Sequence, residues 1–266
     1  EVMVSTEENA EIRRVTLTNH SRHDRTLEVT SYLEPVLAPM DADIAHPAFS
    51  NLFVTTEFVS ENNCLLASRR PRSARQKTIW AMHSITFEGD EPGNLQYETD
   101  RSKFIGRNRD LSNPVAMEAD HPLSDTAGSV LDPVMSLRKR VTVHPGQSVK
   151  ISYITAIGDK RIQMLEIAEK YSDPKVIDRA FELAWNRSRI ESGYLGFKAE
   201  EVELYLKMIP SILMPGPIRK KWAWAIEKNS QGQFGLWKFG ISGDVPIILI
   251  TIKDTEETDL VSRILK

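Results

Sequence analysis

The chain has 266 residues, of which 41% are hydrophobic, and its 34 Lys and Arg against 37 Asp and Glu give a formal net charge of -3. A chain of this size can bury a substantial core, which excludes intrinsic disorder and fibrous repeats. The near balance of charge provides no global positive field for a polyanion, so we expect no nucleic acid among the partners. The single cysteine, Cys64, cannot form an internal disulfide, which favours a reducing compartment, and we expect a cytoplasmic location.

Apolar residues recur at every second position from Glu11 to about Ile157, which predicts a series of β-strands. The polar cluster 19–24 separates two alternating runs and predicts a β-hairpin, and the turn at Pro145-Gly146 predicts a second pair of antiparallel neighbours. Further strand candidates bounded by Gly, Pro, Asn or Asp are 52–59, 64–68, 78–87, 136–143 and 148–157. Many strands with almost no long helix predict a sandwich or barrel.

The pattern becomes helical after Gly158. Residues 161–171 have helical spacing, and Ser172-Asp173-Pro174 supplies an N-cap and a first-turn proline for a longer helix to about residue 192. A third helix is predicted from 198 to about 213, ended by Met214-Pro215-Gly216-Pro217. We therefore place the boundary between a β domain and a helical region near residue 160.

The two ends of the sequence resemble interrupted elements. The first residues have the pattern of a strand interior and 260–266 that of a helix that is cut off, so we expect a piece of a longer polypeptide. The apolar run 245–252 is far shorter than the roughly 20 residues that cross a bilayer as a helix, and its β-branched content favours a strand.

Several short motifs have simple structural explanations. The histidines and aspartate at 20, 23 and 24 lack the spacing and the fourth ligand of a structural zinc site, so we expect no metal. Cys64 lies in an apolar run and is predicted to be a core thiol. The basic clusters 69–72 and 138–140 are short and lack aromatic stacking partners, and we expect solvated loop and strand positions there.

The segment from Tyr97 to Arg107 combines opposite charges with aromatic residues and opens a region without regular periodicity that runs to about Pro133. Long irregular connections in β domains are usually functional or cover a neighbouring domain. Arg101 and Arg107 are therefore candidates for substrate binding, and structural ion pairing is the alternative.

The segment 231–246 has the composition of a saccharide site. Its four glycines allow tight turns, and Gln233, Trp237, Ser242 and Asp244 offer a stacking surface beside hydrogen-bonding groups. Sugars present apolar C–H faces and hydroxyls, which fit an indole beside carboxylate and amide oxygens. The alternative is that Asp244 only caps the start of a helix or strand.

Five dispersed runs give the chain a resemblance to a known family. These are 11–20, 45–50, 98–107, 180–185 and 235–244, which include Ala45-His46-Pro47-Ala48-Phe49-Ser50, Glu98-Thr99-Asp100-Arg101 and Gly240-Ile241-Ser242-Gly243-Asp244. The chain resembles the phosphorylases of glycoside hydrolase family 94, formerly glycosyltransferase family 36. Within it, the chain is most similar to 1,2-β-oligoglucan phosphorylases and to the phosphorylase-like region of cyclic β-1,2-glucan synthases.

The resemblance implies a fold and a division of the chain. We expect an N-terminal antiparallel β-super-sandwich over residues 1–160, a helical linker over 161–214 and the beginning of an (α/α)6 catalytic barrel over 215–266. The family's catalytic acid, an aspartate deeper in the barrel, is then expected beyond residue 266, so no catalytic residue is assigned in this chain. Family members have a barrel helix near 245–252, which leaves that run open between strand and helix.

The resemblance also implies a reaction. Family members carry out reversible phosphorolysis with inversion, in which phosphate is the nucleophile and a single acid suffices. The expected partners are a β-1,2-glucan oligosaccharide, phosphate, the rest of the barrel and a second copy in a homodimer, and no cofactor is expected. If the parent protein is a synthase, the expected location is the cytoplasmic face of the inner membrane.

One departure from the family pattern concerns the barrel entry. Other members read Gly-Phe-Arg-Asp, whereas this chain reads Gly240-Ile241-Ser242-Gly243-Asp244, so Asp244 keeps the sugar-binding aspartate and nothing replaces the arginine. The competing hypothesis is a non-catalytic carbohydrate-binding or dimer-forming sandwich.

Overall fold

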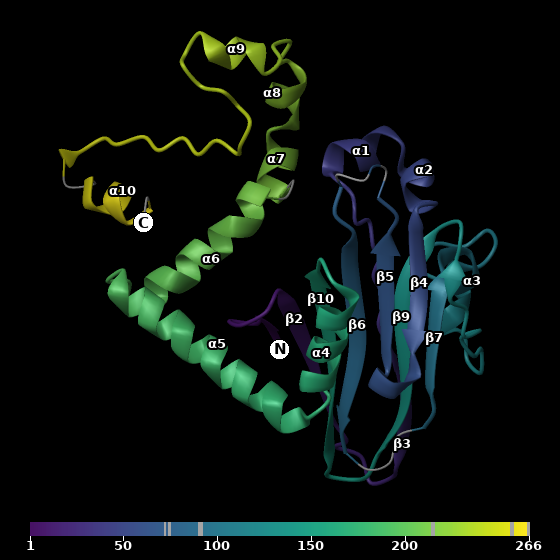
Figure 1. The fold of residues 1–266 in the computed structure, drawn as a ribbon. Coiled ribbons are helices and arrows are strands. Elements are labelled where there is room, and N and C mark those ends of the chain that lie inside the picture. The colour runs from purple at the N-terminus through teal and green to yellow at the C-terminus, as the bar shows by residue number, and fades with distance from the viewer. Residues whose placement is uncertain (72, 74–75, 90–92, 214–215, 256–257, 265–266) are drawn as a thin grey trace. The chain divides into compact units, whose positions relative to one another are not determined.

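The computed structural model describes all residues except 72, 74–75, 90–92, 214–215, 256–257 and 265–266 (Figure 1). The chain divides into two compact units, Glu1–Trp185 and Asn186–Lys266, and each is considered by itself. Across the described segments, no helix is both long and apolar enough to span a bilayer.

Two antiparallel sheets form the first unit, which confirms the predicted sandwich (Figure 1). The larger sheet contains, in spatial order, β1 (Val2–Val4), β2 (Ala10–Thr18), β10 (Ser148–Gly158), β6 (Ile79–Glu88), β5 (Cys64–Arg69), β4 (Val54–Val59) and β8 (Gly128–Ser129). The smaller sheet contains β3 (Arg25–Thr30), β9 (Pro133–Val143) and β7 (Leu95–Asp100). Each strand candidate of the sequence overlaps one of these strands, although the candidate 52–59 begins two residues before β4.

The alternating residues of the strands produce a core on each side of the larger sheet. One set packs between the two sheets and includes Leu65, Leu137 and Ile151. The other set, which includes Met82 and Ile154, faces away from the smaller sheet. Each large apolar side chain buried in this way contributes about 1.5–3 kcal/mol relative to exposure.

One helix and the first turns of another cover apolar residues on the outer face of the larger sheet. They are α4 (Arg161–Lys170) and α5 (Pro174–Tyr194), and both were predicted from their spacing. Met164, Ile167 and Ile177 pack onto the strand residues of that face. The predicted cap of α5 is confirmed, because the carboxylate of Asp173 accepts a hydrogen bond from the Lys175 amide at 2.9 Å.

The region between 97 and 133 is largely irregular, as its sequence predicts, and contains only short elements. It begins with the end of β7 and continues through α3 (Arg101–Ile105), the 3-10 turn η2 (Val115–Met117) and β8. Phe104, Ile105 and Leu123 pack with Val134 of β9 on the outer face of the smaller sheet. The prediction of a long irregular connection is therefore confirmed, and its scattered apolar residues pack on one face of the smaller sheet.

The two predicted hairpins were also wrong. β2 and β3 lie in different sheets, and so do β9 and β10, while β2 pairs with β10 and β3 pairs with β9. Both turns therefore cross from one sheet to the other. They bond to each other, since the Gly146 amide donates to the Asn19 carbonyl at 2.9 Å and the Asn19 amide to the Gln147 carbonyl at 3.0 Å.

Two short helices, α1 (Met40–Ala45) and α2 (Pro47–Asn51), and the 3-10 turn η1 (Ser60–Asn62) complete the first unit. Arg69 of β5, 4% exposed, donates to the carbonyl of Ser50 at 2.8 Å and to its hydroxyl at 2.9 Å. This contact fixes the end of α2 against the sheet. The predicted solvation of Arg69 was wrong for that reason.

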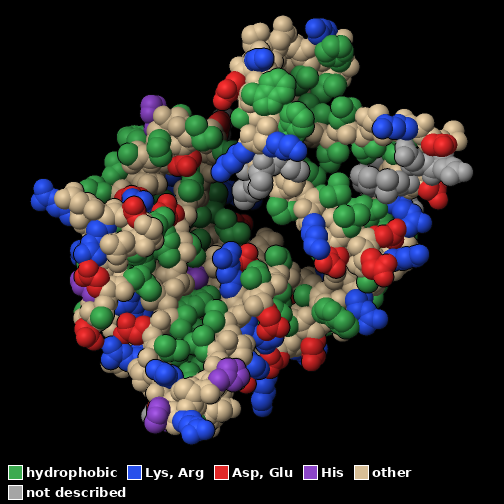
Figure 2. Space-filling model, turned by 180° about the vertical axis from the view of Figure 1, so that it is seen from behind, with side chains coloured by type: hydrophobic (Ala, Val, Ile, Leu, Met, Phe, Trp, Pro, Cys, Tyr) green, Lys and Arg blue, Asp and Glu red, His purple; other side chains and the backbone are tan. Residues whose placement is uncertain are grey.

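The second unit contains α6 (Ala199–Leu213), α7 (Pro217–Lys221), α8 (Ala223–Glu227), α9 (Phe234–Trp237) and α10 (Thr258–Ile264). The predicted third helix is α6, and residues 214 and 215 of its predicted end lie outside the described residues. Residues 245–252 form neither the strand nor the helix considered for them. Apolar side chains lie on the surface of this unit, among them Trp224, Phe234, Phe239 and Leu249 (Figure 2).

Candidate functional site

The segment that follows α9 folds back on that helix. Gly240 and Gly243 have φ values of 73° and 75°, in the left-handed region that residues with a Cβ avoid. A Cβ at Gly243 would also lie 2.9 Å from Cδ1 of Leu236. The bend therefore requires glycine at 243 for both backbone conformation and space.

This bend brings four predicted site residues together. Nε2 of Gln233 donates to the Ser242 carbonyl at 2.9 Å and to Oδ1 of Asp244 at 2.8 Å, and Nε1 of Trp237 lies 3.3 Å from the same carbonyl. Ser242 thus takes part through its backbone rather than its hydroxyl. The Trp237 side chain is 58% exposed and Asp244 is exposed, so an indole face and a carboxylate are both accessible to a ligand.

An open hollow of about 420 Å³ lies beside this bend. Gln233, Lys238 and Phe239 contribute to its lining, together with the backbone around Gly232 and Gly235. Trp237, Ser242 and Asp244 are not among its lining residues. Gln233 is therefore the residue that connects the hollow with the carboxylate.

The two arginine candidates lie in the first unit and differ in their surroundings. Nε of Arg101 donates to Glu34 at 2.9 Å, and its Nη1 lies 3.5 Å from Asp132. Arg107 is exposed and has no ion pair with any residue in the described part of the chain. The contacts of Arg101 are ion pairs, as expected if its role is structural. A binding role for either arginine stays a prediction.

Two buried charged residues that the sequence analysis did not propose as site residues position the segment around Arg101. Glu98, 1% exposed, accepts hydrogen bonds from the amides of Thr99 at 3.0 Å and Asp100 at 2.9 Å. Arg138, 2% exposed, donates to the His121 carbonyl at 2.7 Å and to the Ala116 carbonyl.

The predicted solvation of Arg138 was therefore wrong. Position 138 faces the outside of the smaller sheet, and the segment after α3 covers that face. A sequence signal existed, because Arg138 continues the alternation that begins at Val134 and Ser136. The covering segment could not be inferred from that alternation.

Cys64 is confirmed as a core residue. It is fully buried and free, and burial raises the pKa of its thiol to about 12. The nearby Glu57 carboxylate contributes to this increase in pKa, and Arg161 opposes it. A thiol in this state is not a nucleophile at neutral pH.

Comparison with known proteins identifies the sandwich. The family model of the glycosyl hydrolase 94 supersandwich domain matches residues 1–174. The cyclic beta-(1,2)-glucan synthase NdvB of Rhizobium meliloti (strain 1021) is 33% identical over 266 residues, which is 100% of this chain and 9% of the relative. The N,N'-diacetylchitobiose phosphorylase of Vibrio proteolyticus is 27% identical over 182 residues, or 65% of this chain and 20% of the relative.

A solved structure described as a putative kojibiose phosphorylase from human microbiome matches 64% of this chain and 18% of that chain at 9% identity, with a TM-score of 0.33. A TM-score this low does not establish a shared arrangement of the whole chain. The sequence matches span only a small part of each relative, as their shares of 9% and 20% show. The chain belongs to glycosyl hydrolase family 94, whose supersandwich domain occupies residues 1–174.

Proposed function

We propose that this chain is the N-terminal part of an inverting glycoside phosphorylase, or of the matching region of a glycosyltransferase, that acts on β-1,2-glucan. One observation supports this most strongly. The similarity to the cyclic glucan synthase spans the whole chain, including residues 175–266 beyond the supersandwich match. The specificity for β-1,2-glucan is carried over from the printed name of that relative.

We propose the same division of the chain as the family resemblance implies: a sandwich over 1–160, a linker over 161–214 and the start of an (α/α)6 barrel over 215–266. The exposed aromatic and aliphatic side chains of the second unit support this. Apolar surface of that extent usually marks a face that packs on further protein. The same proposal includes a homodimer, formed with a second copy of the protein, and a cytoplasmic or membrane-associated location.

In the proposed reaction, a phosphate oxygen attacks the anomeric carbon of the terminal glucose from the face opposite the glycosidic bond. The glycosidic C–O bond breaks, and a carboxylic acid gives its proton to the departing oxygen. Glucose 1-phosphate and a glucan shorter by one unit are released. Because phosphate is already anionic, no second carboxylate is needed to activate the nucleophile. The acid belongs to the barrel beyond residue 266, and no cofactor takes part.

The residues of this chain would bind the sugar rather than transfer a proton. The exposed face of Trp237 offers a platform for the C–H face of a glucose ring. One oxygen of Asp244 is held by Gln233, and its other oxygen accepts no hydrogen bond from the described residues, so it is available to a sugar hydroxyl. Arg101 and Arg107 are assigned to the same substrate on the resemblance alone.

The experiment compares this chain with a polypeptide that continues through the barrel. Both are incubated with phosphate and β-1,2-linked oligoglucans, cellobiose or N,N'-diacetylchitobiose, and release of the sugar 1-phosphate is measured. We expect activity only in the longer polypeptide and highest on the β-1,2-linked substrates. Turnover by the 266-residue chain alone would contradict the placement of the acid, and preference for another substrate would contradict the specificity.

A further inference from the structure

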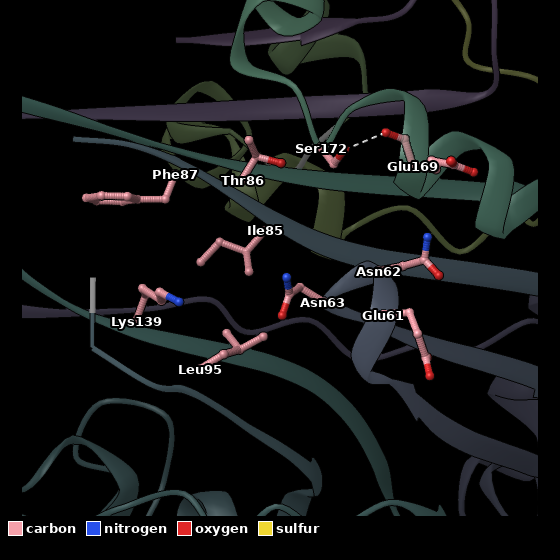
Figure 3. Close-up of a pocket in the computed structure, with 10 residues that line it drawn as sticks. All are labelled: Glu61, Asn62, Asn63, Ile85, Thr86, Phe87, Leu95, Lys139, Glu169 and Ser172. Atoms are coloured by element: carbon pink, nitrogen blue, oxygen red, sulfur yellow. Dashed lines mark hydrogen bonds between the residues drawn. The ribbon is translucent and has the colours of Figure 1, made fainter. Parts of the chain in front are cut away.

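A second hollow, of about 490 Å³, lies within the sandwich unit, and none of the candidate site residues described above lines it. Its lining comes from η1 and the residue after it, from β6, from β9 and from the end of α4 (Figure 3). Lys139 extends its amine toward the part of the hollow where Asn63 and Ile85 lie (Figure 3). Segments that are distant in the sequence therefore meet around one space.

The hollow exists because β5 is shorter than its neighbour β6. β5 begins at Cys64, which pairs with Ser84, whereas β6 continues to Glu88 and pairs there only with β10. In the described structure, no strand pairs with Ile85–Glu88 on the β5 side. Backbone polar groups of this strand edge face the space that a longer β5 would fill, and such groups require hydrogen-bonding partners.

Asn63 ends the turn that opens the hollow. Its φ of 46° lies in the left-handed region, which asparagine tolerates better than most residues. Its side-chain amide and that of Asn62 line the hollow without a hydrogen bond to any described residue. Both amides are therefore available as donors and acceptors.

Lys139 occupies a position that normally holds an apolar residue. The alternation of β9 places it on the same face as Leu137 and Val141, both of which are buried between the sheets. It has no ion pair or hydrogen bond within the described part of the chain, and burial lowers the pKa of its ammonium group. An ammonium group on a core face is costly unless a polar partner offsets the lost hydration. A ligand in the hollow would supply that partner.

The charges and the apolar walls restrict the kind of ligand. The exposed carboxylates of Glu61 and Glu169 also line the hollow, so negative charge exceeds the single positive charge of Lys139 and disfavours an anion. Ile85, Leu95 and Phe87 add apolar surface beside these donors and acceptors. The volume lies within the range of about 300–1,000 Å³ typical of small-molecule sites.

We propose that this hollow is an accessory binding site for a neutral saccharide unit, in which Lys139 and the amides of Asn62 and Asn63 bind hydroxyls and the apolar wall packs against the C–H face of the ring. The proposal does not depend on phosphorolysis or on the bend at Asp244. It gives the sandwich a role of its own in holding a glycan chain.

The test titrates the 266-residue chain with sophorose, cellobiose and maltose and, separately, with sodium phosphate, by calorimetry and by two-dimensional NMR of the side-chain amides. Lys139→Met keeps the length of the side chain and removes its charge. Asn63→Gly removes the amide and keeps the left-handed backbone. The matched control is Arg140→Met, which removes a cation from the opposite face of the same strand. The amide signals of Asn62 and Asn63 distinguish binding in this hollow from binding at the bend of the second unit.

We expect a disaccharide to bind the parent chain and to shift the amide signals of Asn62 and Asn63. Lys139→Met and Asn63→Gly should each weaken binding by about tenfold or more, the effect of losing one charged or buried hydrogen bond, while Arg140→Met binds as the parent does.

Four results would overturn the proposal. These are no binding of any disaccharide, shifts that spare both asparagines, binding by Lys139→Met equal to that of the parent chain, and displacement of the sugar by phosphate. The amide shifts are measured on the parent chain, so they decide the matter even if a variant folds poorly.

Discussion

His83 shows how a single polar residue is accommodated between the two sheets. It is 3% exposed and lies on β6, with its ring nitrogens 2.8 Å from the hydroxyl of Ser31 and 3.0 Å from that of Thr155. Its ring stacks on Tyr153 with a centroid separation of 5.7 Å. Because hydroxyls can donate or accept, both nitrogens of a neutral imidazole are satisfied.

Burial, with a smaller contribution from Arg13, lowers the pKa of His83 to about 4. The unfolded chain takes up this proton near its ordinary pKa of about 6.5, so between the two values the unfolded state binds more protons. Stability from this residue is therefore complete above about pH 6.5 and is lost as the pH falls toward 4. We expect the parent chain to lose roughly 3 kcal/mol more than His83→Gln over this interval in urea unfolding. Parallel stability curves for the two proteins would contradict the assignment.

At the residue scale, the face of a strand on which a side chain lies could be predicted from the sequence, whereas its burial and its hydrogen-bond partners could not. The alternation of β9 already places Arg138 and Lys139 on opposite faces of the strand. It could not show that Arg138 bonds to carbonyls 17 and 22 residues away along the chain, or that Lys139 faces a hollow. Those outcomes depend on segments whose paths local patterns do not determine.

The crossing turns at one end of the sandwich are stabilised by Asn19. Its side chain is 5% exposed, and its Nδ2 donates to the carbonyls of Val143 at 2.7 Å and His23 at 2.8 Å. Its Oδ1 accepts from the amide of Ser21 at 2.9 Å. One side chain thus satisfies backbone groups of both turns where they leave their sheets.

We expect Asn19→Ala to destabilise the sandwich by about 2–4 kcal/mol, because it leaves several buried backbone groups without partners. His20→Ala removes an exposed neighbouring side chain and should change stability by less than about 0.5 kcal/mol. Thermal or urea unfolding of both variants measures the difference. Equal stability of the two variants would show that water replaces the asparagine and that the turns are not held as described.

At the element scale, the sequence predicts where strands and helices lie but not which strands pair. The alternation of apolar residues in β2 and β10 identifies the buried face of each strand. This alternation is the same whether the following strand pairs in the same sheet or lies in the other sheet. The two turns therefore resembled hairpins. The bend after α9 was predictable for a different reason, since Gly240 and Gly243 determine a local backbone path.

The whole first unit depends on helices that follow the last strand. α4 and the beginning of α5 bury the apolar residues on one face of the larger sheet, and the compact unit extends to Trp185. The Arg14 guanidinium lies 4.1 Å from the centre of the Phe181 ring, which adds a polar contact between sheet and helix. The sheets alone would expose that face to water.

We expect residues 1–185 to fold independently with cooperative thermal unfolding, and residues 1–160 to aggregate or unfold. The shorter piece loses Met164, Ile167, Tyr171 and Ile177, each worth about 1.5–3 kcal/mol, and the sum is comparable with the total stability of a domain, about 5–15 kcal/mol. Circular dichroism melting of the two fragments measures this. A cooperative, soluble 1–160 fragment would show that the helices are dispensable for the sandwich.

The central functional claim is that the bend after α9 binds the sugar at the bond that is cleaved. Its most direct test is the rate of glucose 1-phosphate release from β-1,2-linked oligoglucan by the polypeptide that includes the barrel, with Asp244→Ala compared against Glu203→Ala, an exposed carboxylate of α6. We predict that Asp244→Ala lowers kcat/KM by about tenfold or more while the protein stays folded, and that Glu203→Ala changes nothing. Turnover by Asp244→Ala equal to that of the parent enzyme would contradict the account.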